Sequence, residues 1–195
     1  MENKEKLFGR EDCGVMRALV TVSTEEGYDF ECMAVPSDNK QLKYSWENDE
    51  YFYQVLRTGI DNIVLDRLES GLNLFDNHPY DLSAMKTLGI SKSYDVTEAG
   101  LSLKIKLGAR ADDALRKDIQ DGVLKTVSIE GEVRRYNIVR EAGQVPIYYA
   151  DLWEPTSVSL APVPQDIAAQ VNVKRALDAQ LHKKESFIES LTKNF

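Results

Sequence analysis

The chain of 195 residues is long enough for one domain with a proper hydrophobic core, and it has no apolar run long enough to span a membrane. Its formal net charge of −8 argues against nucleic-acid binding as the main role, because that role requires a basic surface. The two cysteines, Cys13 and Cys32, fit neither a metal-ligand spacing nor a disulfide framework, and no signal peptide is recognisable, so a reducing cytoplasm is expected.

The first elements that the sequence predicts are two paired strands. Residues 1–14 are charged and are expected to be loose. Residues 15–23 and 28–35 have the composition of strands, and the intervening residues 25–27 have the composition of a turn. The alternation in the second strand places Cys32 on an apolar face, so we interpret it as a core residue rather than as a catalytic thiol.

The next part of the chain is predicted to be helical. Residues 36–43 are polar and predict a loop. Residues 48–58 predict a helix that is closed by Gly59. A second helix is expected over residues 61–68, ended by Gly71.

A short strand, a hairpin and a helix follow. Residues 72–75 predict a strand that leads to His78. Residues 90–96 and 101–107 predict an antiparallel hairpin around residues 98–100, and its second arm alternates between apolar and polar side chains. Residues 111–121 carry an apolar stripe at helical spacing and predict an amphipathic helix.

The stretch after this helix contains a candidate nucleophile. Gly122 has the position of a glycine that ends a helix, and residues 126–133 then alternate with a period of two. This pattern predicts a half-buried strand with Ser128 on its polar face, exposed in the middle of a rigid element. Two further strands are expected at residues 145–153 and 158–160.

A serine nucleophile needs a base, and the chain has only two histidines. His182 lies beside Lys183 and Lys184 and is expected to be solvated. His78 is therefore the candidate base by elimination, and the alternative is a turn histidine that caps its own backbone.

The C-terminal residues 172–195 predict a separate amphipathic helix. Leu177, Leu181, Ile188 and Leu191 form a stripe among lysines and glutamates. Two roles remain open for it: a helix docked on its own domain, or a partner helix for oligomerisation or for a scaffold protein.

The order of four segments resembles that of the HK97-type phage prohead proteases, over residues 15–171. The segments are FDNHP (75–79), LGISKSYDVTEAGLSLKIKLG (88–108), DIQDGVLKTVSIEGEV (118–133) and DLWEPTSVSLAPVPQDIAAQV (151–171). The family is similar in fold to the herpesvirus assemblins. The resemblance therefore implies an α+β domain built on a curved, mainly antiparallel β-sheet or barrel with flanking helices.

The resemblance also implies a catalytic serine and histidine, which match Ser128 and His78. The third member of the triad departs from the family pattern. Where the family usually has an acid directly before V-S-L, this chain has Ser157. Glu154 and Glu130 are near-equal candidates for the missing acid.

Two other residues complete the alternatives for the third member. Ser157 could orient the histidine as a neutral group, and Asp151 is a further acid near the start of the same motif. The glutamate that follows Ile129 also replaces the glycine found in many relatives.

The function implied by the resemblance is a serine endopeptidase of phage or prophage capsid maturation. Such an enzyme cleaves a scaffold protein, or the scaffold-like end of the major capsid protein, and itself. It would act without a cofactor or metal, as a homo-oligomer, inside the assembling prohead in the bacterial cytoplasm, with no nucleic-acid or membrane partner. The alternative is a weak or inactive protease homologue that acts as an assembly or scaffolding protein.

Overall fold

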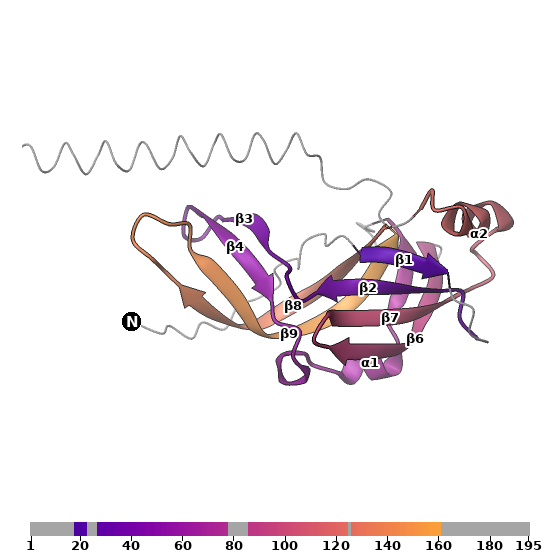
Figure 1. Ribbon diagram of the computed structural model, residues 1–195, viewed down its shortest axis with the longest axis horizontal. Helices are drawn as coiled ribbons and strands as arrows, with labels where there is room; N and C mark the ends of the chain where they lie inside the picture. The colour runs from indigo at the N-terminus through magenta and orange to yellow at the C-terminus, as the bar shows by residue number, and fades with distance from the viewer. Residues whose placement is uncertain (1–17, 23–26, 78–85, 125, 161–195) are drawn as a thin grey trace, which may run out of the picture.

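The computed structural model describes residues 18–22, 27–77, 86–124 and 126–160 (Figure 1). Several expectations lie outside these residues and stay predictions. They concern the loose segment 1–14, the amphipathic helix 172–195, and the two histidines His78 and His182.

The described strands form one mixed sheet. They are β1 Ala18–Val22, β2 Phe30–Pro36, β3 Gln41–Ser45, β4 Glu50–Leu56, β5 Asn73–Asp76, β6 Thr87–Thr97, β7 Gly100–Leu107, β8 Thr126–Val139 and β9 Ile147–Leu160. Their order is β3-β4-β9-β5-β6-β7-β2-β1-β8, and β8 also pairs with β9. The pairings are antiparallel, except that β9 runs parallel to β4 and to β5. The expected α+β class with a mainly antiparallel sheet is confirmed at this level.

The longest pairing in the sheet joins β8 to β9. It runs from Val127 opposite Leu160 to Val139 opposite Ile147. The start of β9 pairs with β4, and its end pairs with β5. Figure 1 shows β3 and β4 at one end of this long pair and β1, β2, β6 and β7 at the other. The β8–β9 pair therefore connects two groups of strands.

The core is built by alternation along the strands. The predicted hairpin over β6 and β7 is confirmed, with Leu101, Leu103 and Ile105 fully buried. The predicted pairing of β1 with β2 is also confirmed. Cys32 of β2 is 1% exposed, and burial raises the pKa of its thiol to about 12, so the thiol stays protonated near neutral pH. Cys32 is thus a core residue, as expected.

Three short helices are described. They are the 3-10 helix η1 Ile60–Asn62, α1 Asp66–Ser70 and α2 Asp113–Gln120. In α2, Asp112 accepts a hydrogen bond from the Leu115 backbone, and Gly122 follows with φ +71°, as expected for a glycine that ends a helix. None of the described helices has the length and apolar character needed to cross a membrane.

The helix predicted over residues 48–58 is wrong, because β4 occupies most of this range. Phe52, Gln54 and Leu56 are buried and their neighbours are half-buried, which is the period of a strand. The run of aromatic residues around Phe52 also favours a strand. The pairings with β3 and β9 complete this choice and also turn the end of the predicted loop 36–43 into the start of β3.

Two other boundaries differ from the prediction. The single helix expected over residues 61–68 is replaced by η1 and α1, because the intervening Ile63 forms a bridge with Trp153. Gly71 ends α1 with φ +93°, as predicted. The two strands expected at residues 145–153 and 158–160 are the single strand β9, which passes through Pro155 at a register shift. Such a bulge tolerates proline, which has no backbone N–H to donate to the neighbouring strand.

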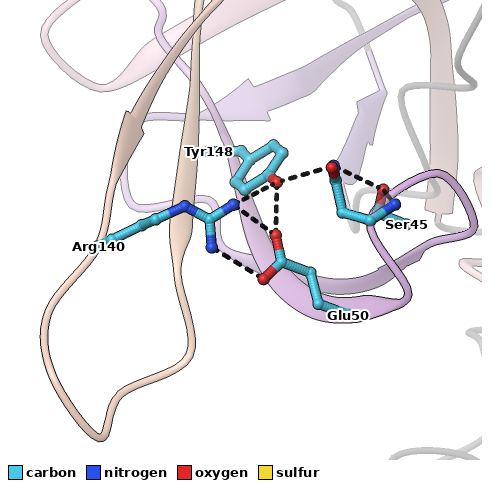
Figure 2. A network of polar contacts seen from close by, with 5 residues as sticks. Ser45, Glu50, Arg140 and Tyr148 are labelled. Carbon is cyan, nitrogen blue, oxygen red and sulfur yellow. Dashed lines mark hydrogen bonds and ion pairs between the residues drawn. The ribbon is translucent and has the colours of Figure 1, made fainter. Parts of the chain in front are cut away.

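A polar network fastens the turn end of the β8–β9 pair to β3 and β4 (Figure 2). Arg140 contacts both carboxylate oxygens of Glu50, at 2.8 and 2.6 Å. The Tyr148 hydroxyl donates to Glu50 at 2.8 Å and accepts from Asn48 at 3.3 Å, and Asn48 also donates to Ser45. Burial and the carboxylate of Glu50 raise the pKa of Tyr148 to about 12.

Candidate active site

Ser128 lies in the strand that the sequence predicts, but its exposure differs from the prediction. The end of α2 at Gly122 leads the chain into β8, and Ser128 is its third residue. The sequence predicts a water-facing side chain, whereas Ser128 is 0% exposed, as are Val127 and Ile129. The prediction of exposure is wrong because both faces of β8 are covered at this point, and alternation alone does not reveal that.

The Ser128 hydroxyl has no hydrogen-bond partner among the described residues. Ser128 lies directly opposite Ser159 of β9, whose hydroxyl is equally buried and equally without a partner there. Side chains of directly opposed residues project from the same face, with Cβ atoms about 4.5–5.5 Å apart. An unsatisfied buried polar group destabilises a protein by about 1–3 kcal/mol. Two of them side by side therefore suggest a role other than stability.

Glu130 and Ser157 form the next pair on this face. They are opposed in the β8–β9 register, and the Ser157 hydroxyl donates to Glu130 Oε2 at 2.6 Å. Ser157 is 5% exposed. Two of the sequence-predicted candidates for the third catalytic member therefore contact each other, two residues along the strands from Ser128 and Ser159.

Glu154 lies in a different environment, between two arginines. Arg67 Nε donates to Glu154 Oε1 at 2.6 Å, and Arg134 forms a short ion pair with Glu154 Oε2. The Arg134 hydrogen bond, followed by that of Arg67, holds the pKa of the Glu154 carboxyl below its ordinary value. The other acid considered, Asp151, forms an ion pair with Arg57 at 2.8 Å.

His78, the predicted base, lies outside the described residues, so its distance from Ser128 stays a prediction. The strand before it is described. Phe75 of β5 is opposite Ser159 of β9, which is opposite Ser128. Asn77 has φ +61°, and its backbone N–H donates to the Leu160 carbonyl at 3.1 Å. At the residue before His78, the chain is therefore separated from β8, the strand of Ser128, by one intervening strand, β9.

The arrangement provides a buried serine hydroxyl with an acid–hydroxyl pair beside it. Among the described residues, no group of three or more histidine, cysteine, aspartate or glutamate side chains could hold a metal ion. Sequence reasoning missed Ser159, and the signal for it is the period of two in SVSL, which places Ser159 on the face of Ser157.

Comparisons of the chain with protein-family models, curated proteins and solved structures find no match.

Proposed function

We propose that the chain is a serine endopeptidase of the HK97-type prohead protease kind, with Ser128 as nucleophile and His78 as base. The observation that carries the proposal is the Ser128 hydroxyl itself. It lies on β8 and lacks a hydrogen-bond partner among the described residues, so no described contact competes with a base for its proton. The resemblance in fold to herpesvirus proteases belongs to the proposal, and the mainly antiparallel sheet that it implies agrees with the described strand pairings.

In the proposed mechanism, His78 takes the proton from Ser128 Oγ as this oxygen attacks the scissile carbonyl. The histidine then gives the proton to the leaving amine, and backbone N–H groups stabilise the oxyanion. Both carboxylate oxygens of Glu154 are engaged by arginines, which ranks Glu154 below the Glu130–Ser157 pair as the group that orients His78.

The proposed substrates are a capsid scaffold protein, or the scaffold-like segment of the major capsid protein, and the protease chain itself. The proposed place of action is the assembling prohead in the bacterial host, with the protease as a homo-oligomer. These parts of the proposal rest on the resemblance of the four sequence segments.

The test is co-expression of the chain with the adjacent capsid and scaffold genes, followed by intact mass of the products. Cleavage should require Ser128, and Ser128→Ala should abolish it. Ser102→Ala is the matched control, because the Ser102 hydroxyl contacts the Met33 sulfur at 3.7 Å and its strand, β7, pairs with neither β8 nor β9. If cleavage in the Ser128→Ala variant equals that of the parent, the assignment is wrong.

A second candidate is a non-enzymatic assembly protein that keeps the protease fold. The complete burial of Ser128 favours it, because a peptide carbonyl must reach Oγ before any reaction occurs. Reaction with a fluorophosphonate separates the candidates, since this reagent needs an activated serine but no specific peptide. Labelling that Ser128→Ala abolishes supports the enzyme, and unlabelled protein supports the assembly role.

A further inference from the structure

Ser159 is a buried hydroxyl to which neither the mechanism nor the sequence motifs give a role. It is 0% exposed and lies directly opposite Ser128 in the β8–β9 pairing. On its other side, the paired residue of β5 is Phe75, whose ring cannot accept a conventional hydrogen bond. Among the described residues, the two cross-strand partners of Ser159 are thus Phe75 and Ser128, and the polar one is Ser128.

The other buried serines show which hydrogen bonds a buried serine makes in this fold. Ser91 accepts a hydrogen bond from the Leu72 backbone at 2.8 Å, Ser157 donates to Glu130, and Ser45 accepts from Asn48. Among the buried serines of the described residues, only Ser128 and Ser159 lack a partner. Because the two are directly opposed, one explanation covers both.

We propose that Ser159 is a positioning residue for Ser128. This inference rests on the proposed function. When the base withdraws the proton from Ser128 Oγ, the Ser159 hydroxyl donates a hydrogen bond to that oxygen and keeps its own proton. Rotation about the Cα–Cβ bonds of the two serines is enough to bring their oxygens together across the strand pair. The contact holds the nucleophile in one rotamer and stabilises the negative charge that develops on it.

The experiment measures the rate at which a fluorophosphonate labels Ser128 in the full chain. Ser159→Ala should lower this rate by about 10- to 100-fold, the effect of losing one hydrogen bond to a charged group. Its thermal unfolding midpoint should stay equal to that of the parent or rise, because the variant loses an unpartnered buried hydroxyl. A purely structural serine would give the opposite shift in the midpoint.

Two variants of matched shape separate the hydroxyl from packing. Ser159→Thr keeps the hydroxyl and should retain most of the labelling rate, whereas Ser159→Val has the same shape without it and should be as slow as Ser159→Ala. If the extra methyl groups unfold both variants, the rate and midpoint of Ser159→Ala decide alone.

The outcomes distinguish this inference from the proposed function. If the parent is labelled at Ser128 and Ser159→Ala is labelled equally fast, the inference is overturned and the proposed function stands. Slow labelling together with a lowered midpoint, or a folded Ser159→Thr as slow as Ser159→Val, also overturns the inference. A parent that is not labelled overturns the proposed function, and the inference with it.

Discussion

At the scale of single residues, burial of polar groups is the most informative property of the candidate site. Ser128 and Ser159 have no described hydrogen-bond partner, while Glu130 and Ser157 satisfy each other. If stability alone were selected, alanine would be expected at these two positions, because a buried hydroxyl without a partner is destabilising. The first prediction follows from this contrast, and the second tests the base that Ser128 would need.

Ser128→Ala should abolish cleavage and leave the protein as stable as the parent, or more stable by about 1 kcal/mol. The variant removes one buried oxygen that has no described partner and fills the same strand position. Cleavage is measured on the co-expressed capsid substrate, and stability by urea unfolding. A strongly destabilised variant would show that the hydroxyl has a structural role.

His78→Ala should lower cleavage as much as Ser128→Ala, and the double variant should be little worse than either. Groups that act as one unit give losses that are far from additive. His182→Ala is the control and should keep the parent rate. Independent, multiplying losses in the double variant would argue against a catalytic pair.

At the scale of elements, ion pairs hold segments distant in the sequence against the β8–β9 pair. Glu154 joins Arg67 of α1 to Arg134 of β8, and its side chain is 11% exposed. The pKa of Glu154 is lowered in the folded state, chiefly by Arg134. The ion pairs of Glu154 therefore stabilise the fold at pH values above 4.5, the ordinary pKa of the carboxyl. This contribution is lost as the pH falls through the lower pKa of the folded state.

Glu154→Gln should destabilise the protein by about 1 kcal/mol at pH 7, since both arginines are half open to solvent. The difference from the parent should shrink as the pH falls below 4.5. Urea unfolding at several pH values measures it. Asp121→Asn, in the exposed Lys117–Asp121 pair of α2, is the control and should change stability little. A pH-independent difference would contradict the ion-pair explanation.

The elements that could be predicted from the sequence are those whose pattern is local. The second arm of the β6–β7 hairpin alternates between buried leucine or isoleucine and more exposed serine or lysine, and Gly122 marks the end of α2. The apolar residues of 48–58 fit the period of a helix as well as that of a strand. The parallel pairing with β9, which is distant in the sequence, makes this segment the strand β4.

The candidate site divides in the same way. Alternation around Ser128 identifies its strand and its face, but what covers that face depends on parts of the chain far away in the sequence. The register that opposes Ser128 to Ser159 is likewise non-local, because a shift at Pro155 sets it.

At the scale of the whole molecule, the long β8–β9 pair carries the candidate site at one end and the β3–β4 hairpin at the other. Ser128 and Ser159 lie near the end that joins β1 and β5. Glu50, Arg140 and Tyr148 lie near the turn end (Figure 2). Because the network and the candidate site lie at opposite ends, weakening the network should loosen β3 and β4 without disturbing the proposed reaction at Ser128.

Glu50→Gln should therefore speed hydrogen exchange in β3 and β4 while leaving exchange in β2 and β7 and the fluorophosphonate labelling of Ser128 unchanged. The expected effect is about 0.5–1 kcal/mol, or roughly 2- to 5-fold in exchange, because Arg140 is 54% exposed.

Tyr148→Phe tests the same network at high pH. The pKa of Tyr148 is raised from its ordinary value of 10 to about 12 in the folded state, so the protonated hydroxyl stabilises the fold fully below pH 10. This contribution is lost as the pH rises from 10 to 12. The parent should thus lose more stability than Tyr148→Phe over that interval, as measured by urea unfolding. Equal losses in both proteins, or faster exchange spread evenly over all strands in Glu50→Gln, would show that the network does not hold this end of the sheet.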